Sequence, residues 1–358
     1  MKEFRLMKGN EALAEAAIRC GCDAYFGYPI TPQSEVLEYL SLEASARTGM
    51  VVLQAESEIA SINMVYGAAG TGKRVMTSSS SPGMSLMQEC ISYIACAELP
   101  CLLVNVVRGG PGLGTIQPSQ GDYFQAVKGG GHGDYSLIVL APSTVQEMVD
   151  FVRLGFDLAF KWRNPVLILT DGALGQMMEK VELFEQQPKI TAVETWATVG
   201  KPKNREKNVI TSLHIQAEKM EETNIHLQNK YKAIAKEETR YETVRCDDAE
   251  IILTGYGLIA RICQKAAQLA REKGIKAGVF RPRTVLPFPS EALNKLAQKE
   301  IVKGFLDVEM NAGQMVEDVR LAVNGLKPVK FHGRMGGVIP SPEEVLAKIE
   351  EMFMGEPV

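Results

Sequence analysis

The sequence lacks the features that mark membrane proteins and nucleic-acid-binding proteins. Its 358 residues include no apolar run of membrane-spanning length, and the N-terminus, MKEFRLMKGNEAL, has no apolar segment of the kind found in signal peptides. Basic residues are not in excess, since 39 Lys and Arg stand against 43 Asp and Glu. The composition therefore argues against a nucleic-acid surface or a polybasic membrane anchor, and we expect a cytoplasmic protein.

Cysteine patterns typical of metal sites are also missing. The chain has seven cysteines, and Cys20 and Cys22 form a C-x-C pair rather than the C-x-x-C spacing of zinc and iron–sulfur sites. The odd number, scattered mostly through apolar segments, indicates buried, reduced thiols. We expect no metal ligands in this chain, so any iron–sulfur cluster would be carried by another chain.

The sequence also lacks the motif by which thiamine-type sites bind magnesium and diphosphate. That motif begins with GDG and continues, further along the chain, to paired asparagines. The nearest segment is TDG at residues 170–172, and no asparagine lies between it and Asn204. The magnesium-diphosphate half of such a site is therefore not expected here.

What is present is the composition and rhythm of an α/β protein. Apolar residues make up 46% of the chain and aromatic residues 7%, and the length favours two domains. Over residues 1–195 we predict alternating strands and helices, which specify a doubly wound parallel sheet. The predicted strands include a short, buried one at residues 51–53, and Asn10 and Ser143 are the expected caps of two helices.

The second half of the chain begins with a change of composition. Residues 196–245 are charged and rich in Gln and Lys, which predicts a connector with a solvated helix; its His214 and His226 are not expected to be metal ligands. The α/β rhythm returns over residues 246–358, which we predict to be a second, smaller parallel α/β domain.

Two glycine-rich segments resemble nucleotide-binding motifs. GAAGTGKR (residues 67–74) follows a predicted helix and opens a strand, the reverse of a P-loop, so we interpret it as a helix end. TGYGLIA (residues 254–260) has the dinucleotide-binding spacing between strand and helix, but no acid follows the next strand, where Arg281 would suit a phosphate instead. A close-packed turn is favoured; the alternative is a nucleotide-binding regulatory or transfer subunit that uses the Gly255 to Gly257 turn.

The segment VVLQAESEIASINMVYGAAGTG (residues 51–72) contains the acid of most interest. A strand at residues 51–53 leads into a helix over residues 58–69, so that Glu58 lies in the first helical turn at the carboxyl end of a strand, where open α/β sheets bind ligands. Helix geometry alone does not separate Glu56 from Glu58, and both could be ordinary first-turn acids that stabilise the helix start.

Further loops follow other strands of the same predicted sheet and should meet Glu58 at one edge. GYPITP (residues 27–32) supplies the Thr31 hydroxyl, and RGGPGLG (residues 108–114) supplies the Arg108 guanidinium, which suits a substrate carboxylate. SSSSPG (residues 78–83) adds hydroxyls and free amides that hold a polar ligand or cap the next helix. Taken singly, each feature has a structural explanation as a turn, a cap or a surface side chain.

In these motifs the chain closely resembles the alpha subunit of 2-oxoacid:ferredoxin oxidoreductases, particularly the branched-chain (2-oxoisovalerate) type, over essentially its whole length. TGYG and EMNAGQM in the second half also fit; the other motifs that carry the resemblance are GYPITP, ESEIASINMVYGAAG, SSSSPGMSLMQE and RGGPGLGTIQPSQGDY.

The resemblance implies a thiamine diphosphate enzyme that is divided between chains. Residues 1–195 would bind the aminopyrimidine, and residues 246–358 would form a transketolase C-terminal-like domain. A beta subunit would bind the diphosphate and magnesium. Gamma and ferredoxin-like subunits with iron–sulfur clusters would pass electrons to ferredoxin, and coenzyme A would take the acyl group.

The resemblance also selects Glu58 over Glu56, because thiamine enzymes generally place a glycine nine residues after the activating Glu, and Gly67 is there. Glu58 would hydrogen-bond N1′ of the aminopyrimidine and favour its imino tautomer, so that the 4′-nitrogen can take the C2 proton.

Other roles are implied by the same resemblance. Arg108 would bind the substrate carboxylate, and Thr31 would bond the substrate oxygen or the cofactor amine. Tyr28 and Ile30 would shape the side-chain pocket. The residues expected at the cofactor are Glu58, Tyr28, Pro29, Ile30, Thr31 and Ser80.

One loop bears on the substrate. The 2-oxoglutarate enzymes, which the chain resembles less closely, tend to read GPSTG where this chain has GPGLG at residues 110–114. Leu113 brings an apolar side chain to that loop, which favours an aliphatic substrate over one with a second carboxylate.

Overall fold

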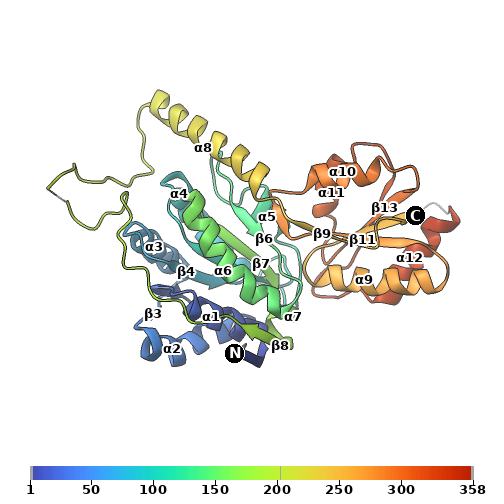
Figure 1. Ribbon diagram of the computed structural model, residues 1–358, viewed down its shortest axis with the longest axis horizontal. Helices are drawn as coiled ribbons and strands as arrows, with labels where there is room; N and C mark the ends of the chain where they lie inside the picture. The colour runs from blue at the N-terminus through green and yellow to red at the C-terminus, as the bar shows by residue number, and fades with distance from the viewer. Residues whose placement is uncertain (1–2, 202, 356–358) are drawn as a thin grey trace.

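The computed structural model describes residues 3–201 and 203–355, and two α/β bodies lie side by side in it (Figure 1). Each is built on its own sheet, of seven and five strands. A two-stranded antiparallel ribbon joins β1 (Glu3–Lys8) to β8 (Met178–Leu183), a pairing that the sequence did not predict.

The first sheet has the strand order β12-β6-β7-β5-β4-β2-β3, and its strands are parallel except for β12 at one edge. The predicted doubly wound parallel sheet is thereby confirmed. The strands are β2 (Ala24–Gly27), β3 (Val51–Gln54), β4 (Val75–Ser79), β5 (Leu102–Val107), β6 (Ile138–Leu140), β7 (Val166–Asp171) and β12 (Thr284–Leu286).

Helices cover both faces of this sheet because alternate strand residues point to opposite sides. In β5, Leu102 and Val104 pack with α1, α2 and α6, whereas Leu103 and Val107 pack with α3 and α4. The helices of this domain are α1 (Gly9–Arg19), α2 (Ser34–Thr48), α3 (Glu58–Ala69), α4 (Ser81–Cys96), α5 (Tyr123–Val127), α6 (Val145–Trp162) and α7 (Gly172–Gln176).

Three local predictions were wrong. Strand β3 is not buried: it is the edge strand beyond β2, and Val51 is 53% exposed. Asn10 does not cap α1, which begins at Gly9 after Lys8; its side chain instead donates to the Pro32 carbonyl. The cap of α6 is Thr144 rather than Ser143, because the Thr144 side chain accepts the bond from the Glu147 amide.

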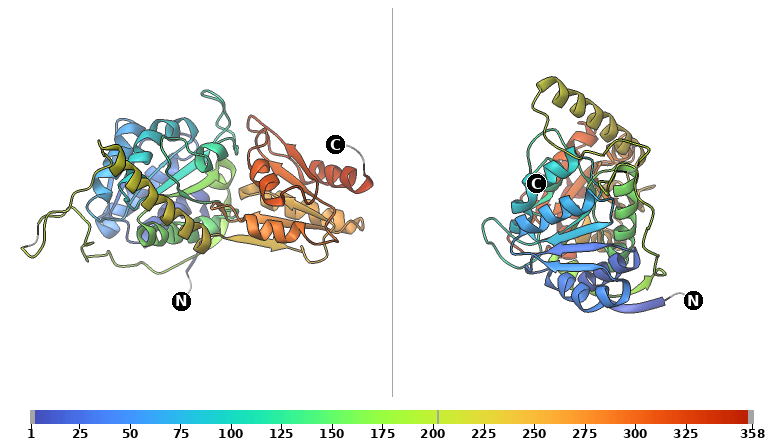
Figure 2. Two further views of the ribbon diagram at one scale, coloured as in Figure 1. Left: turned by 90° about the horizontal axis from the view of Figure 1, so that it is seen from above. Right: turned by 90° about the vertical axis from the view of Figure 1, so that its left-hand side faces the viewer.

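Between β8 and α8 (Ala217–Glu237), the described residues form no helix or strand. The helix runs along the first domain toward the second (Figures 1 and 2). Only Leu227 and Ile234 of α8 are buried, which agrees with the predicted solvated helix. No helix in the described part of the chain combines the length and the apolar character needed to cross a bilayer.

The second sheet has the order β14-β13-β10-β11-β9, with β9 antiparallel to β11 and the other pairs parallel. Strand β9 falls in the predicted connector, residues 196–245, while β12 from the second half joins the first sheet, so strands cross the predicted boundary in both directions. The strands are β9 (Tyr241–Val244), β10 (Ile251–Thr254), β11 (Ala277–Pro282), β13 (Gly304–Glu309) and β14 (Val329–Gly333), and the helices are α9 (Gly257–Glu272), α10 (Ser290–Ala297), α11 (Met315–Val323) and α12 (Pro342–Met354).

The cysteines are free thiols, as the sequence predicts: six are buried and Cys96 is partly buried. Burial raises the pKa of the Cys246 thiol to about 11 and that of Cys20 to about 12. These thiols are therefore protonated and unreactive at neutral pH.

Asp171, at the end of β7, caps α7 at the boundary between the domains. Its carboxylate accepts bonds from the amides of Ala173 at 2.9 Å and Leu174 at 3.1 Å, and burial raises its pKa to about 6. A carboxyl whose pKa is higher in the folded than in the unfolded state binds its proton more tightly when folded. Its ionisation therefore lowers stability as the pH rises from about 4, the unfolded value, to about 6.

We expect Asp171→Asn to remove this pH-dependent cost, because asparagine keeps the capping oxygen and does not ionise. Relative to the wild type, the variant should gain on the order of 2–3 kcal/mol of unfolding free energy between pH 4 and pH 7. Urea unfolding of both proteins at several pH values measures this. A difference between the two proteins that does not change with pH would contradict it.

Candidate active site at the ends of four parallel strands

The loops singled out in the sequence follow β2, β3, β4 and β5. These four strands are neighbours in the sheet and run in parallel, so the loops leave the sheet at a common edge. The convergence predicted from the sequence therefore has its structural basis in the strand order. It brings Thr31 and Arg108 into direct contact and places Glu58 beside the start of α4.

Glu58 is the first residue of α3. Ser57 caps the helix by accepting a bond from the Ala60 amide at 3.2 Å, so neither acid of this segment is needed as the cap. Glu56 is exposed, whereas Glu58 is 7% exposed. Within the described residues, the Glu58 carboxylate has no recorded hydrogen bond or salt bridge, so burial distinguishes the two acids that helix geometry left open.

Gly83, in the first turn of α4, makes room for Glu58. A Cβ atom on Gly83 would lie 2.1 Å from Ser79 Oγ and 2.6 Å from Glu58 Oε1, distances that real side chains do not reach. Glycine is therefore required where the end of β4, the start of α4 and the Glu58 side chain meet. The sequence analysis did not single out Gly83, although its motif, SSSSPG, contains it.

The serines at the end of β4, Ser78 to Ser80, differ in their hydrogen bonding. Ser78 Oγ is paired with Gln33 Oε1 at 2.6 Å and with Tyr25 Oη at 2.8 Å. Ser79 Oγ and Ser80 Oγ are buried and have no hydrogen-bond partner among the described residues. Because buried hydroxyls are normally paired, these two free ones, of which Ser79 adjoins the Glu58 carboxylate at Gly83, mark a place where a polar ligand fits.

Two buried side chains donate hydrogen bonds to the backbone of the loop that contains Thr31. The sequence analysis did not identify them as site residues. Gln33 Nε2 donates to the Tyr28 carbonyl at 3.3 Å, and Asn10 Nδ2 donates to the Pro32 carbonyl at 2.7 Å. For Asn10, the sequence feature that could have revealed this role is the presence of a polar residue within an Ala-rich apolar helix. The loop itself stays accessible, since Pro29 and Thr31 are exposed and Tyr28 and Ile30 are partly buried.

Arg108 follows β5 and carries a charge that no acid neutralises. Its Nη1 donates to the Thr31 carbonyl at 2.9 Å and its Nη2 to the Leu113 carbonyl at 3.4 Å. Its Nε has no partner, and no described carboxylate forms a salt bridge with it. A guanidinium held by carbonyls alone at a partly open position suits an anionic ligand such as a carboxylate.

Together, these groups fit a ring that carries both hydrogen-bond donors and acceptors. Glu58 can accept or share a proton with a ring nitrogen, and the Ser79 and Ser80 hydroxyls can bond neighbouring polar atoms. Arg108 and Thr31 lie on the neighbouring loops, where a second, anionic molecule would bind. Among residues 3–201 and 203–355, no group of three or more His, Cys, Asp or Glu side chains is placed to hold a metal ion.

The turn that resembles a dinucleotide-binding motif is buried against the first domain. Residues 254–257 are all buried, and Gly257 lies against Gln120 and Pro142 of the first domain. Arg281 is not available for a phosphate, because it is 3% exposed and paired with Glu147 and with Glu242. The favoured interpretation, a close-packed turn, is therefore the one that the structure supports.

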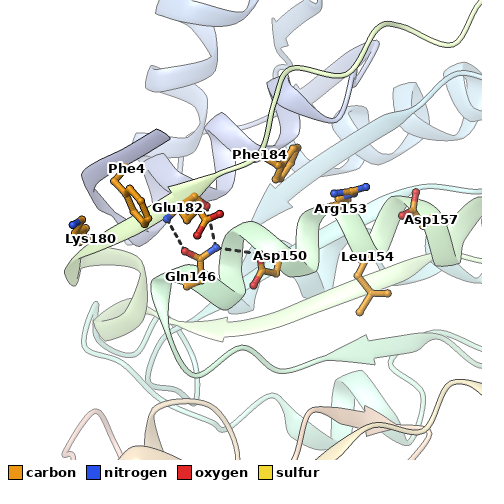
Figure 3. A pocket seen from close by; sticks show the side chains of 9 residues that line it. All are labelled: Phe4, Gln146, Asp150, Arg153, Leu154, Asp157, Lys180, Glu182 and Phe184. Atoms are coloured by element: carbon orange, nitrogen blue, oxygen red, sulfur yellow. Dashed lines mark hydrogen bonds between the residues drawn. The ribbon is translucent and has the colours of Figure 1, made fainter. Parts of the chain in front are cut away.

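A separate pocket of about 850 Å³ lies on α6 and the β1–β8 ribbon (Figure 3). Gln146 crosses it, donating to Asp150 Oδ1 and to the Glu182 carbonyl and accepting from the Glu182 amide. None of the four loops contributes to this pocket, so it is not part of the candidate site.

Comparisons with known proteins identify the family of the chain. The model of the family described as pyruvate flavodoxin/ferredoxin oxidoreductase, thiamine diP-binding, matches residues 15–246. A second model, pyruvate:ferredoxin oxidoreductase core domain II, matches residues 249–345. The chain is 50% identical to ketoisovalerate oxidoreductase subunit VorB of Methanothermobacter thermautotrophicus, covering 97% of each chain. It is 36% identical to 2-oxoglutarate synthase subunit KorA of Methanocaldococcus jannaschii, covering 96% and 98%.

Solved structures show the same fold. The 2-oxoglutarate:ferredoxin oxidoreductase from Magnetococcus marinus, with 2-oxoglutarate, coenzyme A and succinyl-CoA bound, matches with a TM-score of 0.85 and 27% identity. The match covers 98% of this chain and 65% of that one, so the chain spans less than two thirds of that longer protein. A split gene transketolase, an inactive beta4 tetramer, matches with a TM-score of 0.60 at 13% identity, which concerns the fold alone.

The close contact at Gly83 can be tested by measuring the free energy of unfolding of variants. We expect Gly83→Ala to lower the free energy of unfolding by about 1–3 kcal/mol, because the added methyl group overpacks the site although alanine favours helices. Gly67→Ala in α3 is the matched control: nothing lies within 4 Å of the added Cβ, so a gain of up to about 1 kcal/mol is expected. Equal effects in urea unfolding would contradict the contact.

Proposed function

Because the chain belongs to the pyruvate flavodoxin/ferredoxin oxidoreductase family, we propose that Glu58, Thr31 and Arg108 form its half of a 2-oxoacid decarboxylation site. The resemblance drawn from the motifs is confirmed: the chain is a subunit of a thiamine diphosphate-dependent 2-oxoacid:ferredoxin oxidoreductase and works with partner subunits. The observation that carries the assignment of the site is the buried, unpaired Glu58 carboxylate, which meets the free hydroxyl of Ser79 at Gly83.

Thiamine diphosphate, when bound, supplies the nucleophilic carbon and the electron sink for decarboxylation. Glu58 would hold the cofactor's pyrimidine ring by a hydrogen bond to its nitrogen N1′, and this bond would promote proton transfer within the ring. The carboxylate is buried and has no other partner in the described chain, so no other described group would compete for this hydrogen bond. Ser80 and residues Tyr28 to Thr31 would line the ring, and Thr31 would bond the substrate oxygen or the ring amine.

Arg108 orients the substrate by binding its carboxylate. The Thr31 and Leu113 carbonyls hold the guanidinium in place without neutralising it. The substrate carboxylate would thereby be fixed before it leaves as carbon dioxide, and with it the position of the neighbouring carbonyl carbon. Tyr28 and Ile30, both partly buried on the Thr31 loop, would shape the space for the acyl side chain from that side.

The substrate is a branched-chain 2-oxoacid such as 2-oxoisovalerate. A pocket of about 350 Å³ beside Arg108 is lined by Leu113, Pro82 and three glycines, and Arg108 is its only cationic lining residue. The pocket offers no further cation for a second carboxylate. The similarity to the ketoisovalerate oxidoreductase subunit supports the same substrate class.

The remaining components are provided by other chains. A beta subunit binds the diphosphate and magnesium, and gamma and ferredoxin-like subunits with iron–sulfur clusters carry electrons to ferredoxin. Coenzyme A takes the acyl group. The scattered cysteines and the missing GDG motif support this division, and the protein is cytoplasmic.

We expect Glu58→Gln to lower decarboxylation in the assembled complex by at least about 100-fold, since proton-transfer groups contribute that much or more. Assembly should be unaffected, as measured by gel filtration, and turnover is followed as 2-oxoacid-dependent ferredoxin reduction. Glu56→Gln is the matched control because that acid is exposed and two residues away; it should retain activity. Turnover of Glu58→Gln at the wild-type rate would refute the role.

The proposed substrate predicts that kcat/KM of the complex is higher for 2-oxoisovalerate than for 2-oxoglutarate, by at least about tenfold, because an unpaired second carboxylate would have to be desolvated. Leu113→Arg, which adds a cation to the pocket, should reduce this ratio. Steady-state kinetics with both acids give the answer, and a preference for 2-oxoglutarate in the wild-type complex would defeat the substrate proposal.

A further inference from the structure

The segment 119–124 lies between the candidate site and the second domain and is bonded to both. On the side of the second domain, the Gln120 amide donates to the Met310 carbonyl and the Met310 amide donates to Gln120 Oε1, each at 3.1 Å. Gln314 adds two bonds of 2.8 Å, accepting from the Phe124 amide and donating to the Gly121 carbonyl. The segment is therefore fixed to the loop after β13 by paired bonds.

That loop is itself rigidly held. Glu309, at the end of β13, is fully buried, and its carboxylate accepts bonds from the amides of Gln314, Met315 and Val316 at 2.9–3.0 Å. A buried carboxylate that receives several backbone amides at the start of α11 fixes both partners. The position of segment 119–124 thus follows the position of the second domain.

On the side of the first domain, Asp122 reaches the residues of the candidate site. Its Oδ2 accepts from Ser81 Oγ at 2.7 Å and from Asn105 Nδ2 at 2.9 Å, while the Ser81 amide donates to Asn105 Oδ1 at 3.1 Å. Burial of the carboxyl raises the pKa of Asp122, and these two donors act against that shift. The three residues form a closed set of hydrogen bonds, in which Ser81 contributes both its hydroxyl and its backbone amide.

Ser81 connects this set to both halves of the site. Its hydroxyl accepts from the Arg108 amide at 3.1 Å while it donates to Asp122. Ser81 is also the first residue of α4, adopts a positive φ of 22°, and stands two residues before Gly83, which lies against Glu58. Displacing the Ser81 hydroxyl would therefore shift Arg108 and the first turn of α4 together.

The other end of the Arg108 loop also rests on the second domain. A Cβ on Gly109 would lie 3.0 Å from the carbonyl carbon of Gly336, and one on Gly337 would lie 2.4 Å from Gln117 Cβ. The loop of residues 108–117 is thus supported by the second domain near its two ends, through Gly336 and Gly337 and through segment 119–124.

We propose that Asp122 is a positioning residue through which the second domain sets the placement of Arg108 and of the first turn of α4. The proposal rests on the function proposed above, in which Arg108 binds the substrate carboxylate. Asp122 does not touch the substrate in this account. It fixes the Ser81 hydroxyl, and the hydroxyl fixes the Arg108 backbone.

The test measures KM and kcat of the assembled complex with 2-oxoisovalerate. Asp122→Ala should raise KM about tenfold, since it removes the acceptor of two buried hydrogen bonds. Asp122→Asn should recover most of the affinity, because its amide oxygen can accept both bonds. Ser81→Ala should resemble Asp122→Ala, and the double variant should be no worse than either single one, because all three lose the same connection.

Gln314→Ala, in the second domain, should raise KM in the same direction, since it releases segment 119–124. Asp150→Ala, an acid of α6 bonded to Gln146 and remote from the site, is the control and should leave KM unchanged. If Asp122→Ala does not assemble, Ser81→Ala and Gln314→Ala decide the question.

Arg108→Lys separates the two proposals, because lysine cannot reproduce the two-pronged contact and should raise KM. A raised KM for Arg108→Lys with an unchanged KM for Asp122→Ala, or fully additive effects of Asp122→Ala and Ser81→Ala, would overturn the role of Asp122 alone. An unchanged KM for Arg108→Lys would overturn the substrate role of Arg108 and, with it, this inference.

Discussion

The parallel pairing of β3, β2, β4 and β5 is the constraint on which the site depends. Because these neighbouring strands run in one direction, the loops that follow them leave the sheet at one edge. Arg108 therefore donates to the Thr31 carbonyl across 77 residues of sequence, and Glu58 faces the first turn of α4. An alternating antiparallel arrangement in the same strand order would have put Glu58 and the start of α4 at one end of the sheet and Thr31 and Arg108 at the other.

The second property of this edge is that its polar groups are incompletely paired. Ser78 is satisfied by Gln33 and Tyr25, but Ser79, Ser80 and Glu58 have no recorded partner in the described chain. A folded protein normally pairs such groups, because a buried polar atom without a partner costs free energy. Their concentration at one edge agrees with a site that is completed by a cofactor and by a second chain.

The two domains are connected by more than the chain between them. Strand β12 from the second half extends the first sheet, and β9 extends the second. The carboxylate of Glu309 organises the loop that holds segment 119–124, and Asp122 continues the connection to Ser81. The placement of the Arg108 loop is therefore a property of both domains, although all the proposed site residues belong to the first.

The sequence by itself determined the alternating elements, the parallel fold, the family and the position of Glu58 in a first helical turn, because periodicity and motifs are properties of contiguous residues. It did not reveal that β3 is an exposed edge, that strands cross between the halves, or that Asn10 supports the Thr31 loop. Only the tertiary structure decided these points, since strand order and burial depend on which distant segments pack together. The choice of Glu58 over Glu56, which the sequence drew from the resemblance and the spacing to Gly67, is matched in the structure by the burial of Glu58.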